Sequence, residues 1–266
     1  MDSRIVVMGL LALAACSQRP EPRVEAGLPP APAPISDEEA LPALVALDEW
    51  AARFQQASGW ERAALISTGE RLAITRGQAM RRLLLSHPQL AIERAMTPAA
   101  RAALPEELAL HVERFVGGRG TLHVIGVLPA EDDPAPVSTV ERFVTFQGRP
   151  ELFRAGVFGR RLAQTTRENL RLHGVELDGA IALTEAPLRR LQPGEAWPEL
   201  PLEVRGNCPV SRKQADPGLA FHAGDSVVTF CATTHADEYG QALATEEDLT
   251  AASAWSEGAK TVLYIR

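Results

Sequence analysis

The sequence predicts an α+β protein with a helical N-terminal half followed by a β-rich small barrel or sandwich. Apolar residues recur at helical spacing up to about residue 115, and beyond that point they alternate as in strands, with turn residues close together. A third observation concerns the N-terminus, where a proline-rich segment without apolar periodicity predicts a disordered tether. These three patterns order the chain as leader, tether, helical region and β-rich region.

Residues 1–15 have the composition of an export signal. Their apolar run, residues 5–15, is too short to span a bilayer as a mature helix. It ends in Leu13-Ala14-Ala15-Cys16, which resembles the lipobox of bacterial lipoproteins, where the cysteine thiol receives a diacylglycerol. The resemblance implies a lipoprotein signal peptide, a lipid anchor on Cys16 and membrane attachment in the bacterial cell envelope. Since Ser17 follows the cysteine, it implies the outer membrane rather than the inner one. An ordinary export signal that ends in a cysteine is the alternative.

The segment that follows the leader, residues 16–35, predicts an extended and solvated tether because it is rich in proline. Residues 36–266 are long enough for one large domain or two small ones. The formal net charge is −7 and no Lys/Arg-rich block is present, so we expect no nucleic-acid partner.

Residues 36–115 are predicted to be mainly helical. Ser36 and Glu39 have the spacing of a capping box, and apolar residues then recur at helical intervals, which predicts an amphipathic helix over residues 35–57. Two short strand-like stretches follow, residues 64–66 and 72–75, with Gly69 between them. Proline then separates further helical pieces. These pieces cover residues 78–86, 88–96, 98–104 and 105–111.

Residues 116–254 are predicted to be β-rich. The strand candidates, separated by Gly, Pro, Asp or Asn, are TLHVIGVL, TVERFVTF, ELFRAGVF, NLRLHGVEL, AIALTEAPL, LEVRG, LAFHAG and SVVTFCAT. Asp178-Gly179 predicts a hairpin turn. The glycines of FVGGRGTL also predict a turn, because the segment lacks the lysine and Ser/Thr of a phosphate-binding loop and leads into a strand.

The cysteines beyond Cys16 form an even pair in a chain with an export signal. A disulfide between Cys208 and Cys231 is therefore expected, joining two neighbouring β segments. Two alternatives stay open. Cys208, His222, Cys231 and His235 offer sulfur and imidazole ligands suited to zinc, although no CxxC pair is present. Cys208 could also supply a thiolate to a catalytic zinc elsewhere.

No catalytic residue is predicted within this chain, and no cofactor is expected. The sequence contains neither an HExxH nor a GxSxG motif, and its histidines are scattered. Adjacent acidic residues such as Glu246-Glu247-Asp248 are typical of solvated surface or helix N-termini. The patterns therefore indicate a chain that is not an enzyme.

Two long segments resemble the N-terminal region of large secreted bacterial proteins that carry a zinc metallopeptidase domain of the gametolysin or immune-inhibitor-A kind. They are RGQAMRRLLLSHPQLAIERAMTPAARAALPEELALHVERFVGGRGTLHVI and FRAGVFGRRLAQTTRENLRLHGVELDGAIALTEAPLRRLQPGE. In such proteins a W-x-x-G-x-K-x-V-L-x-I-R segment opens the peptidase domain as its first strand. The same arrangement is present here in Trp255, Gly258, Lys260, Val262, Leu263, Ile265 and Arg266.

The resemblance implies a non-catalytic, propeptide-like accessory region, with a downstream peptidase domain as its partner. Residues 255–266 would be a linker and the first strand of that domain, so we expect the chain to be truncated there. The family's zinc-binding helix lies outside this sequence, and no catalytic residue transfers to it. The alternative is a stand-alone envelope lipoprotein that binds a protein, peptide or glycan through its β-rich region.

Overall fold

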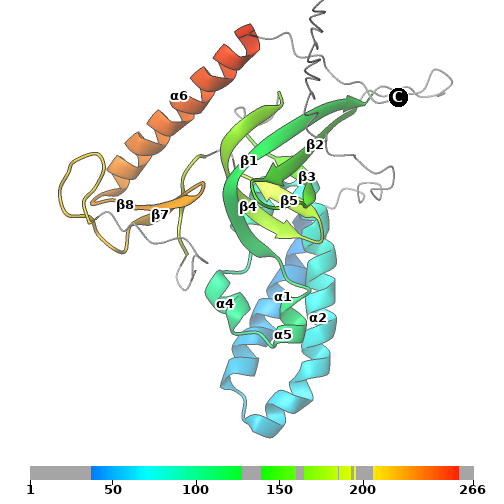
Figure 1. The fold of residues 1–266 in the computed structure, drawn as a ribbon. Helices are drawn as coiled ribbons and strands as arrows, with labels where there is room; N and C mark the ends of the chain where they lie inside the picture. Colours follow the sequence, from blue (N-terminus) through cyan, green and yellow to red (C-terminus); the bar gives the residue numbers. More distant parts are fainter. Residues whose placement is uncertain are drawn as a thin grey trace, which may run out of the picture. The chain divides into compact units, whose positions relative to one another are not determined.

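The structure is a computed structural model that describes residues 37–127, 139–159, 165–184, 186–192, 195 and 206–257. All structural statements concern these residues. The predicted signal peptide, Cys16, the predicted tether, the strand candidate LEVRG except Gly206, and residues 258–266 of the predicted C-terminal linker and strand lie outside them. Residues 255–257, predicted as part of that linker, are helical instead. Within the described residues the α+β fold class is confirmed, because a helical region precedes a closed five-stranded barrel (Figure 1).

Two long helices open the fold, α1 (Asp37–Gln56) and α2 (Gly59–Ser86). The helix predicted over residues 35–57 is thus confirmed, but the two strands predicted at residues 64–66 and 72–75 are wrong. Gly69 explains the error, because a Cβ there would lie 2.3 Å from the Trp50 ring. This glycine is needed for close helix packing and not for a turn between strands.

Three short helices follow at the positions where proline predicts them. They are α3 (Pro88–Glu93), α4 (Pro98–Ala102) and α5 (Glu106–Ala109). Proline suits the first turn of a helix because the N–H group that it lacks has no partner there. The Thr97 hydroxyl caps α4 by accepting a hydrogen bond of 3.2 Å from the Ala100 N–H.

The barrel has the strand order β1-β2-β3-β5-β4 and closes between β4 and β1. Its strands are β1 (Arg114–Val127), β2 (Thr139–Phe146), β3 (Leu152–Val157), β4 (Arg167–Leu177) and β5 (Ala180–Leu183). Neighbouring strands are antiparallel except β3 and β5, which are parallel. Asp178 and Gly179 have φ angles of 50° and 78°, which confirms the predicted turn between β4 and β5.

The glycines of FVGGRGTL lie inside β1, so the turn predicted there is wrong. A Cβ at Gly120 would meet the Thr145 carbonyl oxygen at 2.4 Å, and a Cβ at Gly117 would meet the His222 ring at 2.3 Å. A bulge between Gly120 and Leu122 bends the strand at the same place. The glycines let β1 curve and approach its neighbours closely.

The helices and the barrel share one apolar core. Leu44 of α1 and Met80 of α2 belong to the same buried cluster as Val175 of β4 and Ala182 of β5. A charged pair is buried in the helical region nearby, where Arg76 Nη2 lies 2.5 Å from Glu113 Oε1 and both side chains are fully buried. The Arg76 guanidinium also donates to the Leu44 and Arg94 carbonyl oxygens, and Glu113 accepts from the Met96 N–H. This network satisfies the buried charges.

A second, smaller sheet and a long helix complete the described residues. The sheet contains β6 (Arg189–Arg190), β7 (Ala220–Ala223) and β8 (Ser226–Thr229), and α6 (Thr233–Glu257) follows it directly. The sequence patterns predict β7 and β8 but not α6, which falls within the region predicted to be β-rich. Alanine, threonine and acidic residues dominate α6, so no apolar stripe marks it as a helix in the sequence.

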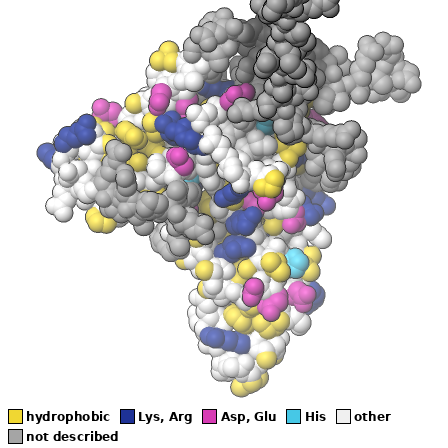
Figure 2. Space-filling view, viewed as in Figure 1, with side chains coloured by type: hydrophobic (Ala, Val, Ile, Leu, Met, Phe, Trp, Pro, Cys, Tyr) yellow, Lys and Arg dark blue, Asp and Glu magenta, His cyan; other side chains and the backbone are white. Residues whose placement is uncertain are grey.

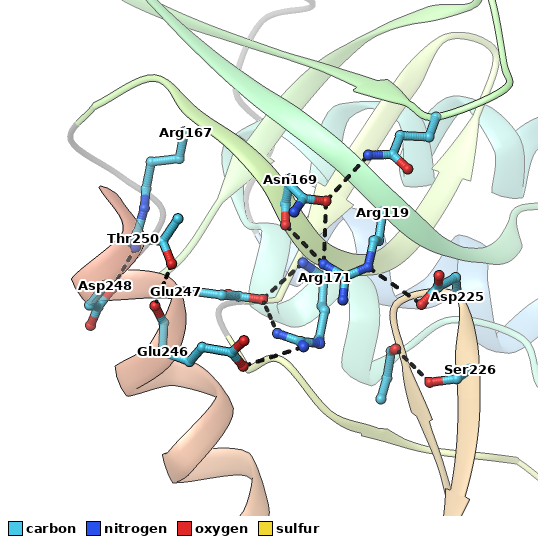
Figure 3. Close-up of polar contacts among 12 residues, drawn as sticks. Arg119, Arg167, Asn169, Arg171, Asp225, Ser226, Glu246, Glu247, Asp248 and Thr250 are labelled. Atoms are coloured by element: carbon cyan, nitrogen blue, oxygen red, sulfur yellow. Dashed lines mark hydrogen bonds and ion pairs between the residues drawn. The ribbon is translucent and has the colours of Figure 1, made fainter. Parts of the chain in front are cut away.

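Ion pairs attach α6 to strand β4 (Figure 3). Glu247 Oε1 accepts hydrogen bonds from both the backbone N–H and Nη1 of Arg171, at 3.0 and 3.1 Å. Arg167 Nη2 lies 2.6 Å from Asp248 Oδ1, and Arg171 Nη2 lies 3.4 Å from Glu246 Oε2. Glu247 is buried, so the interpretation of this acidic run as solvated surface is wrong for its central residue.

On the face shown in Figure 2, acidic and basic side chains of the described residues are interspersed rather than gathered by sign. This distribution agrees with the absence of a Lys/Arg-rich block in the sequence. Among the described helices, none is both long enough and apolar enough to cross a membrane.

Candidate metal centre

Two segments distant in sequence bring together Cys208, Cys231 and His235. Cys208 lies in a tight hairpin before β7, Cys231 lies between β8 and α6, and His235 lies in the first turn of α6. Their ligand atoms all lie within 4.8 Å of one another. Among the described residues, this is the one group of three or more His, Cys, Asp or Glu side chains arranged to hold a metal ion.

The distances suit a shared ion. His235 Nδ1 lies 3.2 Å from Cys231 Sγ and 3.6 Å from Cys208 Sγ, so one ring nitrogen is directed at both sulfurs. Tetrahedral zinc, with Zn–S near 2.3 Å and Zn–N near 2.0 Å, keeps its ligand atoms roughly 3.3–3.8 Å apart. The two nitrogen–sulfur distances are therefore close to those that coordination by one zinc ion requires.

The disulfide predicted between Cys208 and Cys231 is not formed in the structure. Both residues are free cysteines, whereas a disulfide needs the sulfurs at about 2.05 Å. The prediction does place the two cysteines side by side correctly. It omits the imidazole of His235, which lies within contact distance of both sulfurs. With this third ligand the two sulfurs could bind a metal ion.

The backbone around Cys208 forms a compact turn. The Cys208 N–H donates to the Lys213 carbonyl oxygen at 2.7 Å, and the Arg212 N–H donates to the Cys208 carbonyl oxygen at 2.9 Å. Arg212 adopts a left-handed conformation with φ of 62°, which reverses the chain, and Asn207 pairs with Gln214 beyond it. The turn thus holds Cys208 at a fixed place beside the start of α6.

The surroundings of Cys208 favour a thiolate. Burial would by itself raise the pKa of the thiol, but the backbone N–H groups of Ser211 and Cys231, the Ser211 side chain and the Val210 N–H donate to the sulfur and lower that pKa to about 6. A thiolate, and not a thiol, is the form that binds metal. Several donors aimed at one sulfur therefore prepare Cys208 as a ligand.

His222, which the sequence offers as a further metal ligand, does not join this group. Its ring is buried, lies against Gly117 and packs edge-on to His173 at a centroid distance of 5.8 Å. Burial is the main cause that lowers the pKa of His222 to about 4, and the nearby Arg189 adds to it against the opposing charges of Glu195 and Asp225. The assignment of His222 as a ligand is wrong, and the residue belongs to the packing between β1 and β7.

Ser211 lies at this centre but is not among the predicted ligands. Its hydroxyl oxygen lies 3.1 Å from Cys231 Sγ. A signal exists in the spacing, because Cys208 and Ser211 are separated by two residues, and Cys231 and His235 by three. These are the separations of paired ligands in structural zinc sites, with serine in the place of one cysteine.

Comparison of the chain with protein-family models, with curated proteins and with solved structures gives no match. The resemblance to the N-terminal region of metallopeptidases consequently stays a prediction.

Proposed function

We propose that the chain is a non-catalytic module that binds a zinc ion through Cys208, Cys231 and His235. The observation that carries the proposal is the convergence of two sulfurs and one imidazole nitrogen within 4.8 Å. Thiolate and imidazole are ligands that zinc prefers, and each of the three comes from a separate turn or helix start that fixes its position.

The surrounding packing indicates that a bound ion would stabilise the module, whatever the number of its protein ligands. The apolar cluster around the site has three buried members, Cys208, Phe230 and Ala236. A core of this size gives little free energy of folding, and small modules of this kind commonly gain stability from a bound metal. The ion would hold the Cys208 turn, the β7–β8 hairpin and the start of α6 together.

For the whole chain, the lipobox and the two resembling segments support an accessory, propeptide-like role in the bacterial envelope, beside a metallopeptidase domain. The zinc module would then be one part of that accessory region. A stand-alone lipoprotein that binds a protein, peptide or glycan remains the alternative. The zinc proposal is compatible with both.

Metal analysis of the purified, reduced protein tests the zinc proposal. We expect one zinc per chain in the wild type, and loss of that zinc in Cys231→Ser and in His235→Ala. His87→Ala is the matched control because His87 is exposed and lies outside the cluster, so it should retain the metal.

A wild-type protein that stays free of zinc after incubation with the ion would refute the proposal. So would a His235→Ala variant that binds zinc as tightly as the wild type.

A further inference from the structure

We infer that Ser211 keeps the fourth coordination position of this centre open, so that a thiolate from another molecule can bind the metal there. The inference rests on the proposed function, since it concerns the same ion. Structural zinc sites are closed by four protein ligands, whereas sites with an exchangeable position have three. The identity of residue 211 decides which of these two kinds the centre is.

The turn places Ser211 where a second ligand is expected. Two residues separate it from Cys208, and the turn is closed by the hydrogen bond between the Arg212 N–H and the Cys208 carbonyl oxygen. The hydroxyl oxygen lies 3.1 Å from Cys231 Sγ, which puts it at the edge of the ligand group. A cysteine at this position would complete a set of four.

A serine hydroxyl does not complete that set. It stays protonated near neutral pH, so it is a poor ligand for zinc beside two thiolates and an imidazole. It is instead suited to donate a hydrogen bond to the Cys231 sulfur or to a molecule bound at the metal. Ser211 would therefore border the open position and orient what binds there.

The side of the centre at Ser211 is accessible. Cys208 is fully buried, but Ser211, Cys231 and His235 are only half-buried. The next two residues of the turn, Arg212 and Lys213, are exposed and basic. Their charge favours the approach of an anion, and a metal that already has two sulfur ligands favours a soft one. A thiolate combines both properties.

Cobalt substitution tests the inference and separates it from the proposed function. Co²⁺ bound by Cys208 and Cys231 should give sulfur-to-cobalt charge-transfer absorption. Addition of 2-mercaptoethanol to the cobalt protein should then raise that absorption by about half, as thiolate ligands increase from two to three.

Three variants make the test specific. Ser211→Cys should have the higher absorption from the start and should not respond to 2-mercaptoethanol, because its fourth position is filled. Ser211→Ala should also respond, because its fourth position stays open, but it should need more 2-mercaptoethanol since the orienting hydroxyl is gone. Thr234→Ala, which changes an exposed residue in the first turn of α6, is the control and should also respond.

Failure of the metal proposal and failure of the inference about Ser211 give different results. If the wild type shows no charge-transfer absorption with cobalt, the metal proposal itself is wrong. If the wild type binds cobalt but its spectrum does not change with 2-mercaptoethanol, the centre is closed and the inference about Ser211 is overturned. An unchanged starting spectrum in a folded Ser211→Cys protein overturns it as well, because residue 211 would then not reach the metal.

Discussion

The barrel with its helices and the module around Cys208 are stabilised by different means. One cluster that joins α1, α2, β4 and β5 contains eleven fully or nearly fully buried apolar residues, whereas the cluster around Cys208 contains three. Burial of apolar surface can account for the stability of the first region. The second region has too small a core for this, and its buried members include a metal-binding type of side chain. The difference shows that packing is extensive in one part of the chain and sparse in the other, where the proposed zinc ion would supply the missing stabilisation.

Removal of the metal should give the largest difference between the two regions. We expect a chelator to cause loss of amide-exchange protection in the Cys208 turn and the first turn of α6, with strands β1–β5 still protected, because only the small module depends on coordination. Structural zinc contributes roughly 10–16 kcal/mol in isolated zinc-finger peptides, which is an upper guide for this local effect. Hydrogen exchange followed by mass spectrometry would resolve the two regions.

Equal loss of protection in the barrel and in the module would show that the two regions form one cooperative unit. No change in either would show that packing alone holds the module.

Disruption of the buried Arg76–Glu113 pair is the next largest expected effect. Arg76→Met leaves the Glu113 carboxylate buried without its partner and should lower the free energy of unfolding of the helical region by about 3–5 kcal/mol. Urea unfolding followed by circular dichroism measures the change. Arg71→Met on the same helix is the matched control, since Arg71 is exposed, and it should cost much less.

The double variant Arg76→Met with Glu113→Gln tests whether the unpaired carboxylate causes the loss of stability. It should be more stable than Arg76→Met alone, because the uncompensated buried charge is gone. If both single and double variants unfold like the wild type, the pair does not stabilise the fold.

The buried His222 gives the smallest expected effect, and it depends on pH. The pKa of His222 is lowered to about 4, mainly by burial, while an unfolded histidine titrates near 6.5. Between these two values the unfolded chain binds a proton that the folded chain does not. Neutral His222 therefore contributes about 3 kcal/mol to the free energy of unfolding above about pH 6.5. This contribution is lost as the pH falls toward 4.

Chemical unfolding at a series of pH values measures this loss. His222→Gln removes the titrating ring, so its stability should fall less between pH 6.5 and pH 4 than that of the wild type. His87→Gln, which changes an exposed ring, is the control. Parallel curves for the wild type and His222→Gln would contradict the assignment of His222 as a neutral buried residue.

Local patterns were sufficient to predict a large share of the fold. The alternation in TVERFVTF predicts β2 over the residues that form it, Thr139–Phe146, and the prolines predict the starts of α3 and α4. These signals are local because each depends on neighbours in sequence. The errors arise from contacts between residues that are distant in sequence. Gly69, Gly117 and Gly120 are glycines because a distant ring or carbonyl lies against them, and their local pattern resembles that of a turn.

The distinction between local patterns and contacts between distant residues also applies to the candidate centre. The sequence predicts that Cys208 and Cys231 lie side by side, and it offers His235 as a possible metal ligand. It could not exclude His222, because only the pairing of β6 with β7 and the packing on Gly117 direct that ring away from the sulfurs. Ser211 was missed because serine is not a usual zinc ligand, and only its spacing from Cys208 points to the centre.

Because α6 is attached at two places, the number of residues between the two attachments cannot change freely. His235 lies in the first turn of α6, and Glu247 is bound to Arg171 about three turns further along the same helix. One inserted or deleted residue between them would rotate one end relative to the other by about 100° and shift it by about 1.5 Å. Either the imidazole or the buried carboxylate would then leave its partners. Substitutions on the exposed side of this segment should be tolerated, while changes in its length should not.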